Sequence, residues 1–137
     1  MKTYNTNNCD DIRTRFDLSN NLGFIPLYTK VFLDLQNGIN PQASIFTTPM
    51  HLTDASIPLT QWFKHNEGLL IFETYISYKS LNTLADEVIM EKAKKLIFTY
   101  FVENSNGESQ SFTTYDFGPA IIKSKELIYF KALIDLI

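Results

Sequence analysis

The sequence predicts an α+β protein that is predominantly antiparallel β, folded as a barrel or a two-sheet sandwich of about seven strands. Runs of alternating apolar and polar residues recur along the chain and hold most of its 11 phenylalanines and 7 tyrosines, which favour strands. Short turn sequences join neighbouring runs, which favours antiparallel pairing. Several runs are apolar on both faces, so the sheet is expected to close on itself or to pack against another sheet. One amphipathic helix is predicted at about 83–95 and one short helix at about 58–66.

A chain of 137 residues, 45% hydrophobic and 20% charged, fits one globular domain, expected over residues 11–137. Residues 1–10 are polar and rich in asparagine, and we expect them to form a flexible end. This end has no apolar segment typical of a signal peptide, and no apolar run in the chain reaches the roughly 20 residues that span a bilayer. The expectation is a soluble cytoplasmic protein without a membrane span, with export by a non-classical route left open.

The first half of the chain contains three predicted strands. Residues 12–18 alternate and favour a strand, although two apolar residues four apart leave a helix as the competitor. Residues 27–36 alternate over ten positions, with Tyr28, Lys30, Phe32, Asp34 and Gln36 on one face. A turn at Asn37-Gly38 is expected to lead into a return strand at 43–48, which begins after Pro41 because proline cannot donate to a ladder.

The middle of the chain reads as a short helix, a strand, a second helix and a hairpin. The short helix starts at Pro58, buries Leu59, Trp62 and Phe63, and ends at Gly68. A strand at 69–79 follows, with a mixed face made of Leu69, Ile71, Glu73, Tyr75 and Ser77. Thr83 is expected to cap the second helix. Its predicted buried stripe is Leu84, Ala85, Val88, Ile89, Ala93 and Leu96.

The hairpin is predicted from a breaker-free strand at 96–103 and the dipeptide Asn106-Gly107, which is typical of a type I′ turn. A two-residue turn there sets a register that pairs Phe101 with Phe112, Thr99 with Thr114 and Phe98 with Tyr115. Gly118-Pro119 is expected to break the chain. Residues 120–123 and 126–134 are expected to pair across a short turn, and we prefer a strand over a helix for the last segment, 126–137.

Charge and cysteine content exclude several classes of function. The net charge of −3 argues against nucleic-acid binding, which needs lysine and arginine on phosphates. The single cysteine, Cys9, excludes an internal disulfide. The histidines His51 and His65 lie near Asp54 and Glu67, and Asp10 and Asp11 are further candidate ligands, but no metal-ligand spacing links these side chains. We therefore predict no metal and no cofactor.

The sequence also lacks a recognisable catalytic constellation. A nucleophilic pair would need Cys9 beside His51 or His65, and Cys9 lies in the polar end, which is a poor platform for such a site. Glu73 facing Asp116 or Glu103 across a sheet is a weak candidate for a carboxylate pair. A ligand cavity in a barrel could be lined by aromatic side chains, for which core packing is the preferred interpretation. These candidates are Tyr75, Tyr78, Tyr100, Tyr115 and Trp62.

The stretch 37–63 is long and has Asp54 as its only formal charge. Its apolar side chains need cover, either from the domain's own core, which we prefer, or from another subunit. In the second case it is a protein–protein interface, because interface centres are poor in charge. The candidate interface residues are Ile45, Phe46, Met50, Leu52, Ile57 and Trp62.

These observations predict a non-enzymatic structural or assembly protein that acts through protein–protein surfaces as a homo-oligomer. Small barrels with one helix serve as ring or tube subunits in phage tails and secretion systems, and this analogy at the level of fold suggests such a role. One alternative is a monomeric inhibitor or immunity-type protein that binds one partner enzyme. Another alternative is a small-ligand-binding or enzymatic β-barrel.

Overall fold

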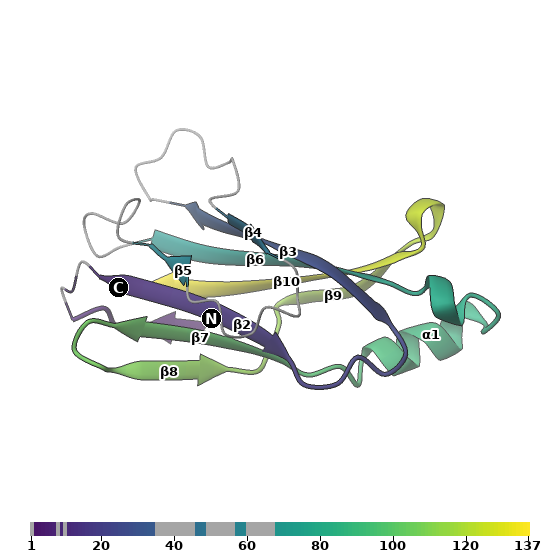
Figure 1. Ribbon diagram of the computed structural model, residues 1–137, viewed down its shortest axis with the longest axis horizontal. Helices are drawn as coiled ribbons and strands as arrows, with labels where there is room; N and C mark the ends of the chain where they lie inside the picture. The colour runs from purple at the N-terminus through teal and green to yellow at the C-terminus, as the bar shows by residue number, and fades with distance from the viewer. Residues whose placement is uncertain (1, 8, 10, 35–45, 49–56, 60–67) are drawn as a thin grey trace.

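The structure, a computed structural model, describes residues 2–7, 9, 11–34, 46–48, 57–59 and 68–137. In these residues two β-sheets pack face to face, and the only α-helix, α1 (Asp86–Ala93), lies at one end of the two layers (Figure 1). Both sheets are open, because each has an edge strand on either side. The fold is therefore an α+β sandwich, which confirms the predicted class and selects the sandwich over the barrel.

Sheet A contains six strands in the described part of the chain. They are β1 (Lys2–Tyr4), β3 (Ile25–Asp34), β4 (Phe46–Thr48), β6 (Gly68–Ser77), β9 (Phe117–Ile122) and β10 (Leu127–Leu136). Their order is β1-β10-β6-β3-β4, and β9 pairs with the first part of β10 while β1 pairs with its last part. All neighbours are antiparallel except β1 and β10, which run parallel.

Sheet B contains four strands in the order β5-β2-β7-β8, all antiparallel. They are β2 (Ile12–Leu18), β5 (Ile57–Pro58), β7 (Phe98–Asn104) and β8 (Ser109–Phe112). The bounds of β2 match the predicted strand. Two short 3-10 segments, Lys79–Leu81 and Lys123–Lys125, lie in the connections after β6 and β9.

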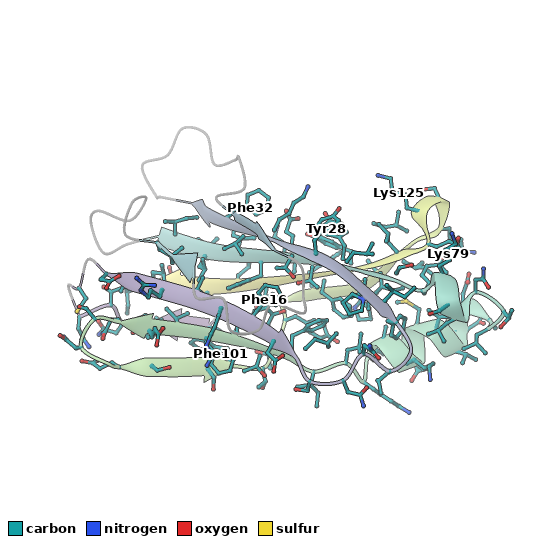
Figure 2. The ribbon with its side chains drawn as sticks, viewed as in Figure 1. Phe16, Tyr28, Phe32, Lys79, Phe101 and Lys125 are labelled. Carbon is teal, nitrogen blue, oxygen red and sulfur yellow. The ribbon has the colours of Figure 1, made fainter. Side chains whose placement is uncertain are left out.

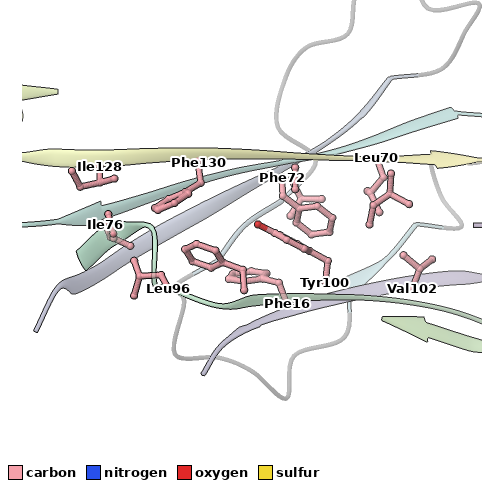
Figure 3. Close-up of a cluster of buried hydrophobic side chains, with 14 of the residues drawn as sticks. Phe16, Leu70, Phe72, Ile76, Leu96, Tyr100, Val102, Ile128 and Phe130 are labelled. Atoms are coloured by element: carbon pink, nitrogen blue, oxygen red, sulfur yellow. The ribbon is translucent and has the colours of Figure 1, made fainter. Parts of the chain in front are cut away.

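The core lies between the inner faces of the two sheets (Figure 3), and in β6, β7 and β10 buried residues alternate with half-buried ones over most of the strand. Tyr100 of sheet B packs on Phe72 of sheet A, with ring centroids 4.8 Å apart. Phe98 packs on Phe130 at 4.7 Å. Aromatic side chains are large and bury much apolar area, so a few of them fill the space between two sheets. The alternating runs seen in the sequence therefore correspond to a two-layer core.

The helix is shorter than predicted and buries a narrower stripe. It begins at Asp86, and Ala85 occupies the capping position without a side-chain hydrogen bond, so the prediction that Thr83 caps the helix is wrong. Ile89 and Ala93 are buried, as predicted. Val88 is 47% exposed, because α1 covers only the end of the sandwich and contacts it along one side. The predicted stripe is therefore wrong at Val88, as it is at Leu84 and Ala85, which are also exposed.

The hairpin between β7 and β8 exists, but its predicted register is wrong by one residue. Tyr100, not Phe101, lies opposite Phe112. The loop holds one residue more than a two-residue turn, because the side-chain oxygen of Asn104 accepts hydrogen bonds from the backbone N–H groups of Asn106 and Glu108. Gly107 alone among the loop residues has positive φ, +82°, which fits a type I turn followed by a bulge and not a type I′ turn.

The last two strands pair as predicted, and the final segment is a strand and not a helix. Leu127 lies opposite Ile122 at the closed end of this pair. The prediction that Gly118-Pro119 breaks the chain is wrong, because both residues lie inside β9. They form a bulge there: between the pairs Ala120–Tyr129 and Phe117–Lys131, two residues of β9 lie opposite the single residue Phe130.

Two further segments differ from expectation. The polar N-terminal end, for which no regular structure was expected, contributes β1, and Tyr4 and Thr6 are buried against the sandwich. Pro58 lies in β5 and does not start a helix, because the backbone around it pairs with β2: the N–H of Leu59 donates to the carbonyl oxygen of Ile12 at 2.7 Å. The rest of the predicted short helix, 60–66, lies outside the described residues.

Candidate functional site

The outer face of sheet A is the surface of the described chain where aromatic side chains gather. In β6, the buried residues Leu70, Phe72, Thr74 and Ile76 alternate with half-buried ones that point away from sheet B. Figure 2 shows Tyr28 and Phe32 on the side of sheet A away from Phe16, which lies between the sheets. The outer face includes Tyr28, Lys30, Phe32, Leu69, Ile71, Glu73, Tyr75, Phe117, Tyr129, Lys131, Leu133 and Asp135.

A row of aromatic rings crosses this face at right angles to the strands. Tyr28 of β3, Tyr75 of β6 and Tyr129 of β10 lie opposite one another in the ladder. Their ring centroids are 5.0 Å and 5.2 Å apart. Phe117 of β9 lies opposite Lys131 in the ladder, and its ring contacts the end of the row, 5.9 Å from Tyr129. The row therefore spans four neighbouring strands with rings in contact throughout.

The next row along the strands is charged, and the one after it is apolar. Lys30, Glu73 and Lys131 lie opposite one another. The Tyr129 hydroxyl donates to Glu73 Oε2 at 2.5 Å, which ties the charged row to the aromatic row. The apolar row contains Phe32, Ile71 and Leu133.

Two tyrosines of the outer face, Tyr75 and Tyr129, have a raised pKa. Partial burial and the hydrogen bond to Glu73 raise the pKa of Tyr129, and burial together with the charge of Glu73 raises the pKa of Tyr75. A phenol with a raised pKa keeps its proton throughout the neutral range. At Tyr75 and Tyr129 the face therefore presents neutral hydroxyl groups, and its charges include Lys30, Glu73, Lys131 and Asp135.

A shallow hollow of about 360 Å³ lies at the corner where β9 leaves β10 and β1 takes its place. Its lining residues are Asp116, Phe117, Tyr129, Lys131 and Leu133. Asp116 bridges the gap between the two edge strands, because its Oδ2 accepts from Lys2 Nζ and from the backbone N–H of Leu133, both at 2.6 Å. The hollow thus has a fixed polar corner and an aromatic wall.

The outer face of sheet B has a different character. Arg15 stacks on Phe101, with its guanidinium carbon 3.8 Å from the ring centroid, and Arg13 lies 3.7 Å from Asp11. Arg15 and Asp17 alternate with buried residues of β2, so this face carries ordinary solvated charges. The contrast between the two faces makes the outer face of sheet A the candidate functional surface.

The tyrosines proposed from the sequence do not line one cavity. Tyr100 and Tyr78 are buried, and Tyr115 packs on Phe98 and Phe130. Only Tyr75 of this set lies on the outer face of sheet A, and Trp62 is outside the described residues. The Tyr100 hydroxyl has no hydrogen-bond partner among the described residues, and burial with the nearby charge of Asp116 raises its pKa.

The other candidate side chains are scattered. Glu73 and Asp116 are both engaged on sheet A, while Glu103 belongs to sheet B. Cys9 accepts a hydrogen bond from Asn106 Nδ2 at 3.3 Å. His51, Asp54, His65, Glu67 and Asp10 lie outside the described residues. Within the part of the chain that is described, no three side chains of the metal-binding types come together.

The predicted interface residues fall mainly outside the described structure. These are Ile45, Met50, Leu52 and Trp62. Phe46 and Ile57 are described at the backbone, where Phe46 pairs with Val31 and Ile57 with Thr14. The interface role of 37–63 therefore stays a prediction.

The outer face of sheet A was not predicted as a site, although its parts were visible in the sequence. The alternation separated Tyr28, Lys30 and Phe32 from their neighbours, and it marked the mixed face of residues 69–77. The missing information was the order of the strands. Only when β3, β6 and β10 lie side by side do their outward residues form aromatic, charged and apolar rows.

Comparison with known proteins gives no match: no family model, no curated protein and no solved structure is significantly similar to this chain. In the described residues, no helix has the length and apolar character needed to cross a membrane. The functional argument therefore rests on the surface itself.

Proposed function

We propose that this protein is a non-enzymatic assembly protein, and that it associates with further copies of itself through the outer face of sheet A. The observation that carries the proposal is the aromatic row of Tyr28, Tyr75, Tyr129 and Phe117, which lies on the side of sheet A away from the core. A second apolar row, Phe32–Ile71–Leu133, lies on the same face beyond the charged row of Lys30, Glu73 and Lys131.

The composition of this face supports a protein contact. Tyrosine and phenylalanine are enriched at the centres of protein interfaces, because a large rigid ring gives contact area at little cost in side-chain entropy. A tyrosine hydroxyl also keeps its hydrogen bond at a wet rim, as Tyr129 does with Glu73. A sheet face that contacts only solvent usually carries polar and charged side chains, as the outer face of sheet B does with Arg13, Arg15 and Asp17.

Solution mass distinguishes the forms that this assembly can take. A ring or tube subunit, the role suggested by analogy, gives a large particle, whereas one self-complementary face gives a dimer. A monomer at every concentration would favour the inhibitor or immunity-type alternative. The measurement is light scattering over a concentration series, for example from 5 μM to 500 μM, spanning roughly the dissociation constants of weak to moderate protein contacts.

Ile71→Lys tests whether the outer face of sheet A makes the contact. Ile71 lies in the middle strand of the face, so an unpaired ammonium group there must be desolvated on association, and the oligomer should dissociate. The matched control is Thr99→Lys on the outer face of sheet B, which also replaces a half-buried β-branched residue of a central strand. Loss of the oligomer in both variants, or in neither, would refute the assignment, with far-UV circular dichroism reporting that both are folded.

A further inference from the structure

The outward residues of β10 form a pattern that would match a second, antiparallel copy of the same strand: apolar residues would face apolar residues, and the cation would face the anion. They are Tyr129, Lys131, Leu133 and Asp135, and Ile137 follows directly after the strand. Counted from Leu133, a cation lies two residues before it and an anion lies two residues after it. Large apolar side chains lie four residues away on both sides, and Ile137 is 49% exposed.

From this pattern we propose, resting on the proposed function, that the outer face of sheet A binds a second copy of the chain around a two-fold axis that runs across the strands along Phe32, Ile71 and Leu133. A rotation about this axis reverses the strand direction and leaves each strand facing its own equivalent. Leu133 then meets Leu133 of the second copy, and Lys131 meets Asp135 of the second copy. A two-fold contact contains every unlike pair twice, so the interface has two Lys131–Asp135 ion pairs.

The distances of stacked sheets permit this contact. Residues two apart on a strand are separated by about 6.7 Å, and the sheets of a sandwich pack about 10 Å apart. Lys131 and Asp135 lie on β10, one strand from the centre of the face at β6, so the roughly 30° rotation between packed sheets displaces them little. The long lysine side chain spans the remaining gap. Tyr129 reaches Ile137 of the second copy by the same symmetry.

Charge disfavours one of the two competing arrangements. A two-fold axis along β6 would bring Lys131 over Lys30 and Glu73 over Glu73 of the second copy, which sets like charges against each other at three positions. An axis between β6 and β10 would bring Lys131 over Glu73, which is an oppositely charged pair, although one oxygen of this carboxylate already accepts the Tyr129 hydroxyl. The experiment below distinguishes this axis from the proposed one. Within the described residues, neither Lys131 nor Asp135 forms an ion pair.

The test is a charge exchange measured by sedimentation velocity. Lys131→Asp alone and Asp135→Lys alone each set like charges together, and each should weaken the dimer by about tenfold or more. The double variant Lys131→Asp/Asp135→Lys should recover the wild-type dissociation constant to within about threefold, because the exchanged pair is again complementary. An equimolar mixture of the two single variants should form a mixed dimer. Lys125→Asp, in the exposed turn before β10, is the control that should change nothing.

The outcomes separate this inference from the proposed function. If Ile71→Lys dissociates the oligomer but the double variant does not recover the wild-type dissociation constant, the outer face of sheet A makes the contact and the axis across the strands is wrong. Recovery of Lys131→Asp by Glu73→Lys in place of Asp135→Lys would overturn the inference in favour of the axis between β6 and β10. A wild-type protein that is monomeric throughout the concentration series would refute the proposed self-assembly itself.

Discussion

At the scale of single residues, Gly118 is fixed by the close approach of β9 to β10. A Cβ atom on Gly118 would lie 2.5 Å from the carbonyl oxygen of Tyr129 and 3.1 Å from the Cα atom of Phe130. Its φ of +106° is also a conformation that side-chain-bearing residues rarely adopt. The bulge that shapes the hollow beside Tyr129 therefore requires glycine at this position.

Gly118→Ala should destabilise the protein by about 3 kcal/mol or more, because strain at positive φ adds to a clash with backbone atoms that cannot rotate away. Gly107→Ala provides the comparison: its φ is +82°, but a Cβ there meets nothing within 4 Å, so about 1 kcal/mol is expected. Urea unfolding measures both free energies. Equal losses of unfolding free energy in the two variants would mean that a Cβ atom at position 118 does not clash with the carbonyl oxygen of Tyr129.

Tyr100 illustrates a buried polar group that lacks a partner among the described residues. Its ring packs against Phe72 and Phe98. Burial raises the pKa of its hydroxyl far above the ordinary 10.0, with smaller contributions from Asp116 and Tyr115. Ionisation in the unfolded chain thus begins at a lower pH than in the folded protein.

Tyr100→Phe should therefore leave the stability at pH 7 unchanged or raise it by up to about 1 kcal/mol, since it removes an unpaired hydroxyl and keeps the ring. Below pH 10.0, the ordinary value, the raised pKa costs the wild type nothing. Above it, the unfolded tyrosine ionises while the folded one stays protonated, so the wild type loses stability that the variant keeps. The variant's advantage should grow by about 1 kcal/mol between pH 9 and pH 11, as measured by urea unfolding at each pH. A gap that stays constant or shrinks would contradict the assignment of the raised pKa to Tyr100.

At the scale of elements, alternation located the strands well, because a two-layer fold gives each strand one buried face and one outer face. The strand 12–18 matches β2, and the long strand at 69–79 matches β6 apart from its ends. Register was harder to predict. The side chain of Asn104, which organises the loop before Gly107, adds a residue to the turn that the dipeptide Asn106-Gly107 did not reveal.

Helix α1 shows why spacing alone assigned too wide a buried stripe. Helical periodicity identifies residues on one side of a helix, but the width of the covered side depends on the partner surface. Here the helix meets the end of the sandwich and is tied to the turn before β10 by the ion pair of Asp86 with Lys123, at 2.6 Å. Ile89 faces the core, while Val88 beside it is exposed.

Ile89→Ala should cost about 2–5 kcal/mol, as other large-to-small changes in cores do, because Ile89 is 1% exposed. Val88→Ala should change stability by no more than about 0.5 kcal/mol, since it removes exposed methyl groups and alanine is the better helix former. Thermal unfolding of the two variants compares adjacent residues of one helix. A larger loss of stability from Val88→Ala than from Ile89→Ala would contradict the assignment of Ile89 to the buried side of the helix.

At the scale of the whole molecule, the α+β, mostly antiparallel class followed from the sequence, which left a barrel and a two-sheet sandwich open, while the candidate site did not follow from it. Residues such as Tyr28, Tyr75 and Tyr129 are far apart in the chain, and alternation indicates that each is outward or inward without indicating which strands are neighbours. The order β10-β6-β3 is a tertiary property, set by the packing of the whole sandwich. The aromatic row could therefore not be assembled before the fold was known.

If the outer face of sheet A associates as proposed, the melting temperature should depend on protein concentration. Association stabilises the folded form by mass action, so the melting temperature should rise over a hundredfold increase in concentration, by a few degrees for a chain of this size. Ile71→Lys should abolish the dependence, and Thr99→Lys should retain it. Differential scanning calorimetry at several concentrations provides the measurement, and a wild-type melting temperature independent of concentration would count against self-association.

The parallel pair of β1 and β10 has a consequence for the time course of synthesis. Lys2 to Tyr4 leave the ribosome long before their ladder partners, Ile134 to Leu136, which are added more than a hundred residues later. β6 and β9 also pair with β10, so three strands of sheet A cannot complete their pairing until β10, which is translated after them, is available. Pairing across so long a segment must overcome a large loop-closure entropy, which slows folding. The nascent chain therefore carries an incomplete sheet A with open edges until residue 136 has emerged from the ribosome.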